Sequence, residues 1–188
     1  MQILPHTGNI FDLLLGDCDG IIVWAKGGFT CIGTDWKIFR KKISEDDDKF
    51  TRIGSPWKTH HSIPLFVRVN NERKYVYFLR NELEADTISD SRLVLQLTAA
   101  IKTLKLLGCE SIAFNGVRST EYVPGLPTDS MEVKAQKQLH NKTVNRERVD
   151  LIVDTLYSFN TQAPVNLSVH LISKNDVFTR SILSPINI

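Results

Sequence analysis

Apolar residues occur along this chain in two patterns, short unbroken runs and longer stripes with helical spacing. The unbroken runs lie at residues 20–25 and 111–114, and residues 166–172 predict the last strand. A strand that is covered on both faces of a sheet is apolar throughout, so these runs predict buried strands. Their composition is typical of the inner strands of a parallel sheet.

The stripes predict three helices, over residues 34–42, 91–107 and 148–159. In the second of these, leucine and alanine recur every three or four residues and would form one apolar face. One of residues 89–90 is a suitable N-cap for it. Gly108 is placed to end it in the left-handed conformation.

Weaker signals complete the order of elements. Residues 1–5 predict an edge strand, and residues 8–14 predict a turn that leads into a short helix. The apolar stretches 64–69 and 74–79 predict a hairpin joined by a turn at 70–73. Strands and helices therefore alternate, which favours an α/β sandwich with a mostly parallel or mixed sheet.

Residues 121–146 interrupt this alternation. Their first ten residues are rich in turn formers, and residues 131–140 are polar with only weak helical character. We therefore expect an inserted loop at about 121–146 within a single domain that spans residues 1–188. A loop of this length in a compact domain is usually functional or disordered.

Composition narrows the class of protein. The net charge of +2 is too small, and the basic residues too dispersed, to favour nucleic acid as a partner. Cys18, Cys31 and Cys109 show neither zinc spacing nor a disulfide framework. No apolar run reaches the ~20 residues of a membrane span, and residues 1–6 do not resemble a signal peptide. We expect a reduced cytoplasmic setting, a monomer, and no membrane contact, metal or cofactor.

Two junctions between a strand and a following loop indicate a binding site. One follows the strand at 20–25 and leads through a glycine-containing loop to the helix at 34–42; the other follows the strand at 111–114. Ligands in α/β sheets bind where strands end, and backbone N–H groups at a helix start favour phosphate. Two such loops at one edge would suit a ligand with two phosphates.

Four ordered motifs resemble the macro domain family, whose members bind ADP-ribose. They cover most of the chain outside residues 121–146 and are similar above all to the subgroup of terminal ADP-ribose protein glycohydrolases. The first motif is Gly8-Asn9-Ile10, and the second is Ile21-Ile22-Val23-Trp24-Ala25 followed by Ile32-Gly33-Thr34-Asp35 and Ile38-Phe39-Arg40-Lys41-Lys42. The third is Lys74-Tyr75-Val76-Tyr77-Phe78-Leu79, and the fourth is Ser111-Ile112-Ala113-Phe114-Asn115-Gly116-Val117. The resemblance implies a three-layer α/β/α sandwich with a mixed central sheet.

The resemblance also implies a set of ligand contacts. Asn9 stands where the family has an acidic residue that accepts the adenine amino group, although an Asx turn explains it equally well. The remaining binding candidates lie in the two loops, at the last strand's end or beside Asn9: Ile10, Ala25, Gly27, Gly28, Gly33, Thr34, Asn115, Gly116, Val117, Arg118, Ser119, Thr120 and Ser173.

Both loops depart from the family pattern, because the first has few glycines and the second lacks the usual proline followed by Gly-x-Gly. The hydroxyls of Thr34 and Thr120 and the charge of Arg118 could contact phosphate instead. Helix capping by Thr34 and a solvated Arg118 are the alternative interpretations. An altered phosphate or ribose end of the ligand is a further expectation.

Lys26 and Asp35 are the candidate catalytic residues. Lys26, Gly27 and Gly28 lie where the family contacts the distal ribose, and a lysine there with a lowered pKa could form a Schiff base with an opened ribose. Asp35 could act as a general base. An exposed loop lysine and an acidic residue in the first turn of a helix are the structural alternatives.

The sequence therefore predicts binding of ADP-ribose or a related nucleotide, free or attached to a macromolecule. Hydrolysis of an ADP-ribosyl bond, or of a phosphate on ADP-ribose, is the activity expected if the protein is an enzyme. A binder without turnover and a protein-interaction module with a degenerate pocket are the alternatives.

Overall fold

The computed structural model describes residues 1–26, 30–31, 65–69, 72–80, 87–115, 118–162 and 165–173. The helix predicted over 34–42 lies outside them.

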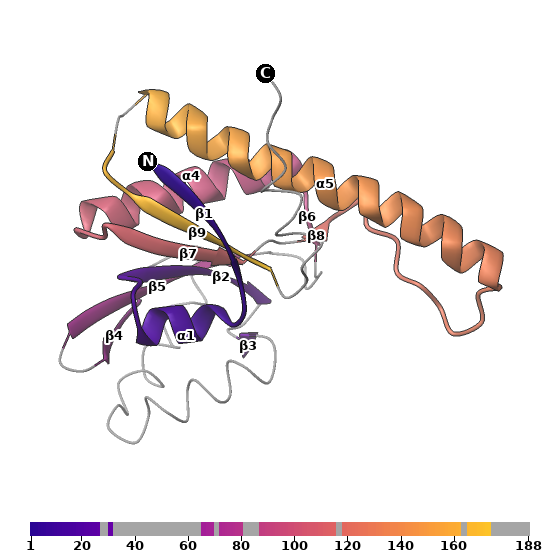
Figure 1. Ribbon diagram of the computed structural model, residues 1–188, viewed down its shortest axis with the longest axis horizontal. Coiled ribbons are helices and arrows are strands. Elements are labelled where there is room, and N and C mark those ends of the chain that lie inside the picture. Colours follow the sequence, from indigo (N-terminus) through magenta and orange to yellow (C-terminus); the bar gives the residue numbers. More distant parts are fainter. Residues whose placement is uncertain are drawn as a thin grey trace.

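Seven strands of the described residues form one sheet in the middle of the molecule, in the order β1-β9-β7-β2-β5-β4, with β3 paired to β2 (Figure 1). Strands β1, β9, β7, β2 and β5 run parallel, whereas β4 and β3 are antiparallel to their neighbours. The sheet is therefore mixed, as predicted. Its strands are β1 (Gln2–Thr7), β2 (Gly20–Lys26), β3 (Thr30–Cys31), β4 (Leu65–Val69), β5 (Glu72–Arg80), β7 (Ser111–Asn115) and β9 (Ser168–Ser173).

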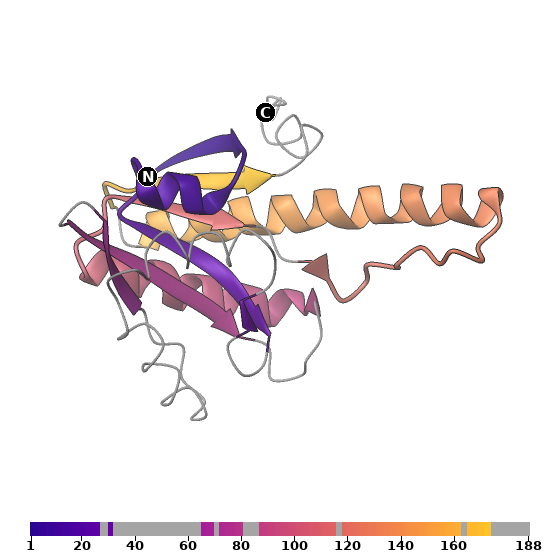
Figure 2. The same ribbon diagram turned by 90° about the horizontal axis from the view of Figure 1, so that it is seen from below.

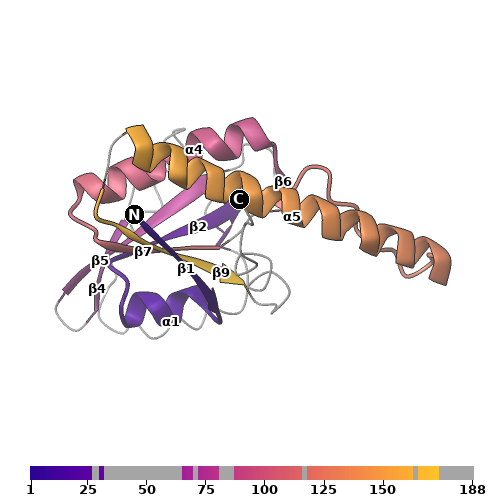
Figure 3. The ribbon, with the colours of Figure 1, turned by 45° about the horizontal axis from the view of Figure 1, so that its top comes forward.

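Helices cover both faces of this sheet. The short helix α1 (Ile10–Leu15) lies on one face, and α4 (Asp90–Leu106) and α5 (Met131–Gln162) lie together on the other (Figures 1 and 3). Each face has its own apolar core, with Ile21 and Phe78 toward α1 and Ile22 and Phe114 toward α4 and α5. The predicted α/β/α sandwich is confirmed.

Local chemistry explains where these helices begin and end. The side chain of Asn9 accepts a hydrogen bond from the N–H of Phe11 at 3.0 Å and so caps α1. Ser89 is the N-cap residue of α4, without a side-chain hydrogen bond. Gly108 follows α4 with φ +87°, a conformation that costs a residue with a Cβ atom. The edge strand at the N-terminus and the hairpin are also present, but Glu72 and Arg73 belong to β5 rather than to the turn.

The prediction of an inserted loop at about 121–146 is wrong for most of this segment. Residues from Met131 onward form one continuous helix of 32 residues that includes the helix predicted at 148–159. Its first half projects from the sandwich, and residues 121–130 run outward from β8 alongside it to the start of the helix (Figures 1 and 2). We call residues 121–146 the arm, and residues 121–130 the strap. The strap contacts this half of the helix through polar groups. Because these contacts need no apolar helix face, the sequence shows no apolar stripe over residues 131–146.

A second, small sheet lies near the carboxyl end of β7. It consists of β6 (Thr87–Ile88) and β8 (Arg118–Ser119), which pair in parallel. We call these four residues the ribbon. Within the part of the chain described here, no helix is long and apolar enough to cross a membrane.

Candidate functional site

The carboxyl ends of the five parallel strands share one edge of the sheet. Residues that were predicted as ligand contacts from separate parts of the sequence lie on this edge. The strands end at Thr7 (β1), Lys26 (β2), Arg80 (β5), Asn115 (β7) and Ser173 (β9).

Strands β2 and β7 are neighbours in the sheet, and the chain leaves them toward opposite sides of the sheet. They pair in parallel, with Ile22 beside Phe114. From β2 the chain continues to β5 on one side, and from β7 it continues through α5 to β9 on the other side. Connections that leave neighbouring strands in opposite directions open a crevice at their carboxyl ends, where ligands bind in open α/β sheets. The two loops singled out in the sequence start here.

Strand register places the predicted residues relative to one another. Ala25 is paired with Arg80 on β5 and with Cys31 on β3, and Asn115 is paired with Ile172 on β9. Since neighbouring strands lie about 4.8 Å apart, the ends of β2 and β9 are roughly 10 Å apart across β7. That span suits a ligand with two phosphates that lies across three strand ends.

Asn9 and Ile10 both take part in the start of α1, directly after β1. The Asn9 side-chain oxygen accepts from the N–H of Phe11, which is the Asx turn considered as the alternative to adenine binding. Ile10 is 2% exposed and packs in the core on the α1 face. Its side chain is therefore structural, and only its backbone lies where a ligand contact was predicted.

The second predicted loop continues into the ribbon. Arg118 and Ser119 form β8, so their backbone pairs with Thr87 and Ile88. Thr120 is exposed in the turn that follows. The end of this loop is thus held by a strand pair, which the sequence did not predict.

Seven of the predicted site residues lie outside the described part of the chain. Among them is Asp35, one of the two candidate catalytic residues. They are Gly27, Gly28, Gly33, Thr34, Asp35, Gly116 and Val117.

Arg148 is a residue that sequence reasoning missed. It is 4% exposed, and its guanidinium donates to the carboxylate of Asp90 and to the backbone carbonyl of Ile88 in β6. Burial lowers its pKa, and the nearby Asp90 carboxylate opposes that shift. The sequence signal that could have found it is the position of this arginine directly before Val149, at the start of the apolar stripe in the helix predicted at 148–159.

The buried thiols lie away from the carboxyl edge and do not fit a nucleophilic role. Cys18 and Cys109 are free and buried. Burial raises the pKa of both thiols, that of Cys109 to about 12. A thiol in that state stays protonated at neutral pH. The described residues also contain no group of three or more histidine, cysteine or acidic side chains that could hold a metal ion.

Comparison with known proteins agrees with this geometry. No protein-family model matches the chain, and no curated protein matches it by sequence. Solved structures do match. A Trypanosoma brucei macrodomain in complex with ADP-ribose is 12% identical, with a TM-score of 0.61 over 96% of this chain and 67% of that one. A mutant macrodomain of Oceanobacillus iheyensis is 11% identical, with a TM-score of 0.59 over 96% and 89%.

A third match is the macrodomain of Mycobacterium tuberculosis DarG, which is 13% identical, with a TM-score of 0.55 over 93% of this chain and 99% of that one. The chain has the macrodomain fold. The resemblance in the four sequence motifs is thereby confirmed at the level of the fold. Membership of the glycohydrolase subgroup stays a prediction.

Proposed function

We propose that this chain binds ADP-ribose, free or attached to a macromolecule, at the carboxyl edge of its sheet. The observation that carries the proposal is the reversal of chain direction between β2 and β7 in a macrodomain fold. Residues predicted as contacts from separate sequence motifs lie along that edge. The Trypanosoma brucei macrodomain of the same fold was solved in complex with ADP-ribose, which supports the choice of ligand.

Calorimetric titration with ADP-ribose tests this proposal. We expect a dissociation constant in the micromolar range, about −8 kcal/mol. ADP as a second ligand reports how much the distal ribose contributes. Ala25→Arg adds a long side chain at the carboxyl end of β2 and should weaken binding at least about tenfold, or about 1.4 kcal/mol. A circular dichroism melt of the variant checks that it is folded.

Glu110→Arg is the matched control. Glu110 is exposed and directly precedes β7, at the amino edge of the same sheet. The substitution adds the same cationic side chain and leaves the proposed site untouched, so the affinity for ADP-ribose should stay within about twofold. Absence of heat with wild-type protein at millimolar ADP-ribose would overturn the proposal.

We further propose that the site hydrolyses an ADP-ribosyl bond, with Lys26 as the nucleophile. Lys26 is the last residue of β2 and pairs with Thr30 of β3, and this position at the carboxyl end of β2 supports the proposal. Its amine would displace the attached group from C1 of the ribose; one amine proton goes to the departing group and the other to the ring oxygen as the ring opens to an imine, which water then hydrolyses to release ADP-ribose. With free ADP-ribose the same imine forms with loss of water. Asp35 is the proposed base.

Borohydride trapping tests the covalent step. Reduction of an imine formed with ADP-ribose fixes the ligand to the chain as a stable mass increase on the peptide that contains Lys26. Lys26→Gln should abolish the adduct and leave ADP-ribose affinity within about tenfold of wild type. A chain that binds ADP-ribose but forms no adduct and releases no product from ADP-ribosylated protein would be a binder without turnover.

A further inference from the structure

The ribbon lies one short connection away from the proposed nucleotide site. β7 ends at Asn115, and β8 starts at Arg118. The ribbon is therefore close in sequence to the end of β7, which belongs to the proposed site. A contact that fixes the ribbon therefore also constrains the chain close to the carboxyl end of β7.

Strands of two residues cannot hold their own position. A ladder as short as Thr87–Ile88 with Arg118–Ser119 is marginal in water, so the ribbon depends on what packs against it. Ile88 is one anchor, since its side chain is 2% exposed within the core beneath α4 and α5. Helix α5 also packs against β8.

Arg148 supplies the polar anchor of the same strand. Its guanidinium donates to the Ile88 carbonyl and to the carboxylate of Asp90, so it joins α5 to β6 and to the first residue of α4. Asp90 is largely exposed on its side chain, whereas Arg148 is buried. A guanidinium keeps its charge when buried, and breaking such a pair from one side leaves polar groups without partners. The contact therefore fixes the backbone of β6 in direction as well as in place.

We propose that Arg148 is a positioning residue for the nucleotide site, which it serves by holding the ribbon against α5. This inference rests on the proposed function. Arg148 itself does not touch the ligand. It acts through Ile88 on β6 and Asp90 at the start of α4, and through the pairing of β6 with β8, which begins three residues after the end of β7.

Affinity and stability measured together test this role. Arg148→Met keeps most of the side-chain volume and removes the donors; we expect ADP-ribose to bind at least about tenfold more weakly. Arg148→Lys keeps the charge but cannot reproduce the planar fork, so it should recover only part of the affinity. Asp90→Asn, which leaves the Ile88 carbonyl bonded to Arg148, should have the smallest effect.

Lys74→Met is the matched control for the loss of a buried cation. Lys74 is 6% exposed, and its amine donates to the Gly16 carbonyl at 3.1 Å and pairs with Glu72 at 3.5 Å. These contacts lie at the amino edge of the sheet. This variant should lower the melting temperature and leave ADP-ribose affinity within about twofold of wild type. Equal losses of affinity in Arg148→Met and Lys74→Met would overturn the proposal.

Hydrogen exchange without ligand gives a second readout that does not depend on the proposed function. In Arg148→Met, the amides of residues 87–88 and 118–119 should exchange faster, whereas those of β2 and β5 should match wild type. If wild-type protein fails to bind ADP-ribose, the proposed function is refuted. The exchange experiment still decides whether Arg148 holds the ribbon in place. Unchanged exchange in the ribbon of Arg148→Met would refute the positioning role.

Discussion

The two halves of α5 are stabilised in physically different ways. The half that packs on the sheet buries Val149, Ile152 and Leu156, each 3% exposed or less. The half in the arm leaves Met131 at 82% and Leu139 at 70% exposure. One continuous helix is thus held at one end by apolar burial and at the other by polar contacts with the strap.

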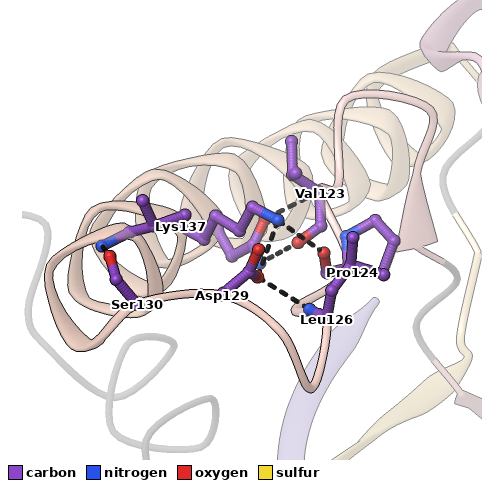
Figure 4. Close-up of polar contacts among 8 residues, drawn as sticks. Val123, Pro124, Leu126, Asp129, Ser130 and Lys137 are labelled. Atoms are coloured by element: carbon purple, nitrogen blue, oxygen red, sulfur yellow. Dashed lines mark hydrogen bonds and ion pairs between the residues drawn. The ribbon is translucent and has the colours of Figure 1, made fainter.

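Those polar contacts are specific and numerous. Lys137 donates to the carboxylate of Asp129 at 2.8 Å and to the carbonyl of Pro124 at 3.3 Å, and Asp129 accepts from the N–H of Leu126 (Figure 4). The side chain of Asn141 both donates to and accepts from the backbone of Val123. Hydrogen bonds contribute about 1 kcal/mol net each, so the arm should open more readily than the sandwich.

The largest expected difference between the two halves is the cost of deleting a leucine side chain. Leu156 is 0% exposed, and Leu156→Ala should lower the free energy of unfolding by about 2–5 kcal/mol because it leaves a cavity. Leu139→Ala, made on the same helix in the arm, should change it by less than about 0.5 kcal/mol. Urea denaturation of both variants measures the difference. Similar values would mean that the arm is packed against something.

Two glycines, one in the sandwich and one in the strap, extend the comparison to backbone conformation. Gly108, in the sandwich, has φ +87° with nothing within 4 Å of a built Cβ, so Gly108→Ala should cost about 1–2 kcal/mol through backbone strain alone. Gly125, in the strap, also has open space around a built Cβ, and no left-handed φ. Gly125→Ala should be neutral or slightly stabilising. Thermal unfolding of the two variants checks the sign of each effect.

Acidification should weaken the sandwich through His170. Burial lowers the pKa of this histidine and the nearby His6 lowers it further, whereas Asp17 raises it. The rings of His6 and His170 lie 6.3 Å apart, and Ser111 Oγ lies 3.2 Å from His170 Nε2. Because the unfolded chain takes up the proton first, stability is complete above about pH 6.5 and falls below it.

Urea midpoints measured from pH 7.5 downward test this dependence. His170→Gln should show a shallower decline below about pH 6.5 than wild type, because the variant has lost the group whose pKa differs between the two states. His140→Gln in the arm is the control, since His140 contacts only the exposed backbone carbonyl of Glu121 among its described hydrogen bonds. An unchanged slope in His170→Gln would exclude this histidine as the cause.

The smallest expected effect on global stability is in the strap. Lys137 and the Leu126 N–H hold the pKa of Asp129 below its usual range. Asp129→Ala should therefore speed proteolysis and hydrogen exchange within residues 121–130 and leave the global unfolding midpoint unchanged. Limited proteolysis followed by mass spectrometry locates the cut. A large fall in the midpoint would show that the arm and the sandwich unfold together.

Apolar pattern explains which parts of the fold the sequence predicted. The runs at 20–25 and 111–114 became β2 and β7 because both faces of each strand are buried. The first half of α5 was missed because its contacts are hydrogen bonds between side chains and the strap. A signal was present at Ser130, whose hydroxyl accepts from the N–H of Val133 at 3.2 Å and caps the helix.

The candidate site was predictable in position and less so in detail. Strand ends follow from apolar runs, so Ala25, Lys26 and Asn115 could be assigned to one edge. The parallel pairing of β6 with β8 could not be predicted, because two-residue strands carry no pattern. The contact of Arg148 with Asp90 and Ile88 spans about 60 residues and has no local signature either.

Hydrogen exchange of wild-type protein with and without ADP-ribose tests the central claim most directly. The account predicts slower exchange at the carboxyl ends of β2, β7 and β9, within residues 24–26, 113–115 and 171–173. It also predicts no change at residues 131–139 in the arm. Protection confined to the arm, or no protection anywhere at saturating ADP-ribose, would contradict a nucleotide site at this edge of the sheet.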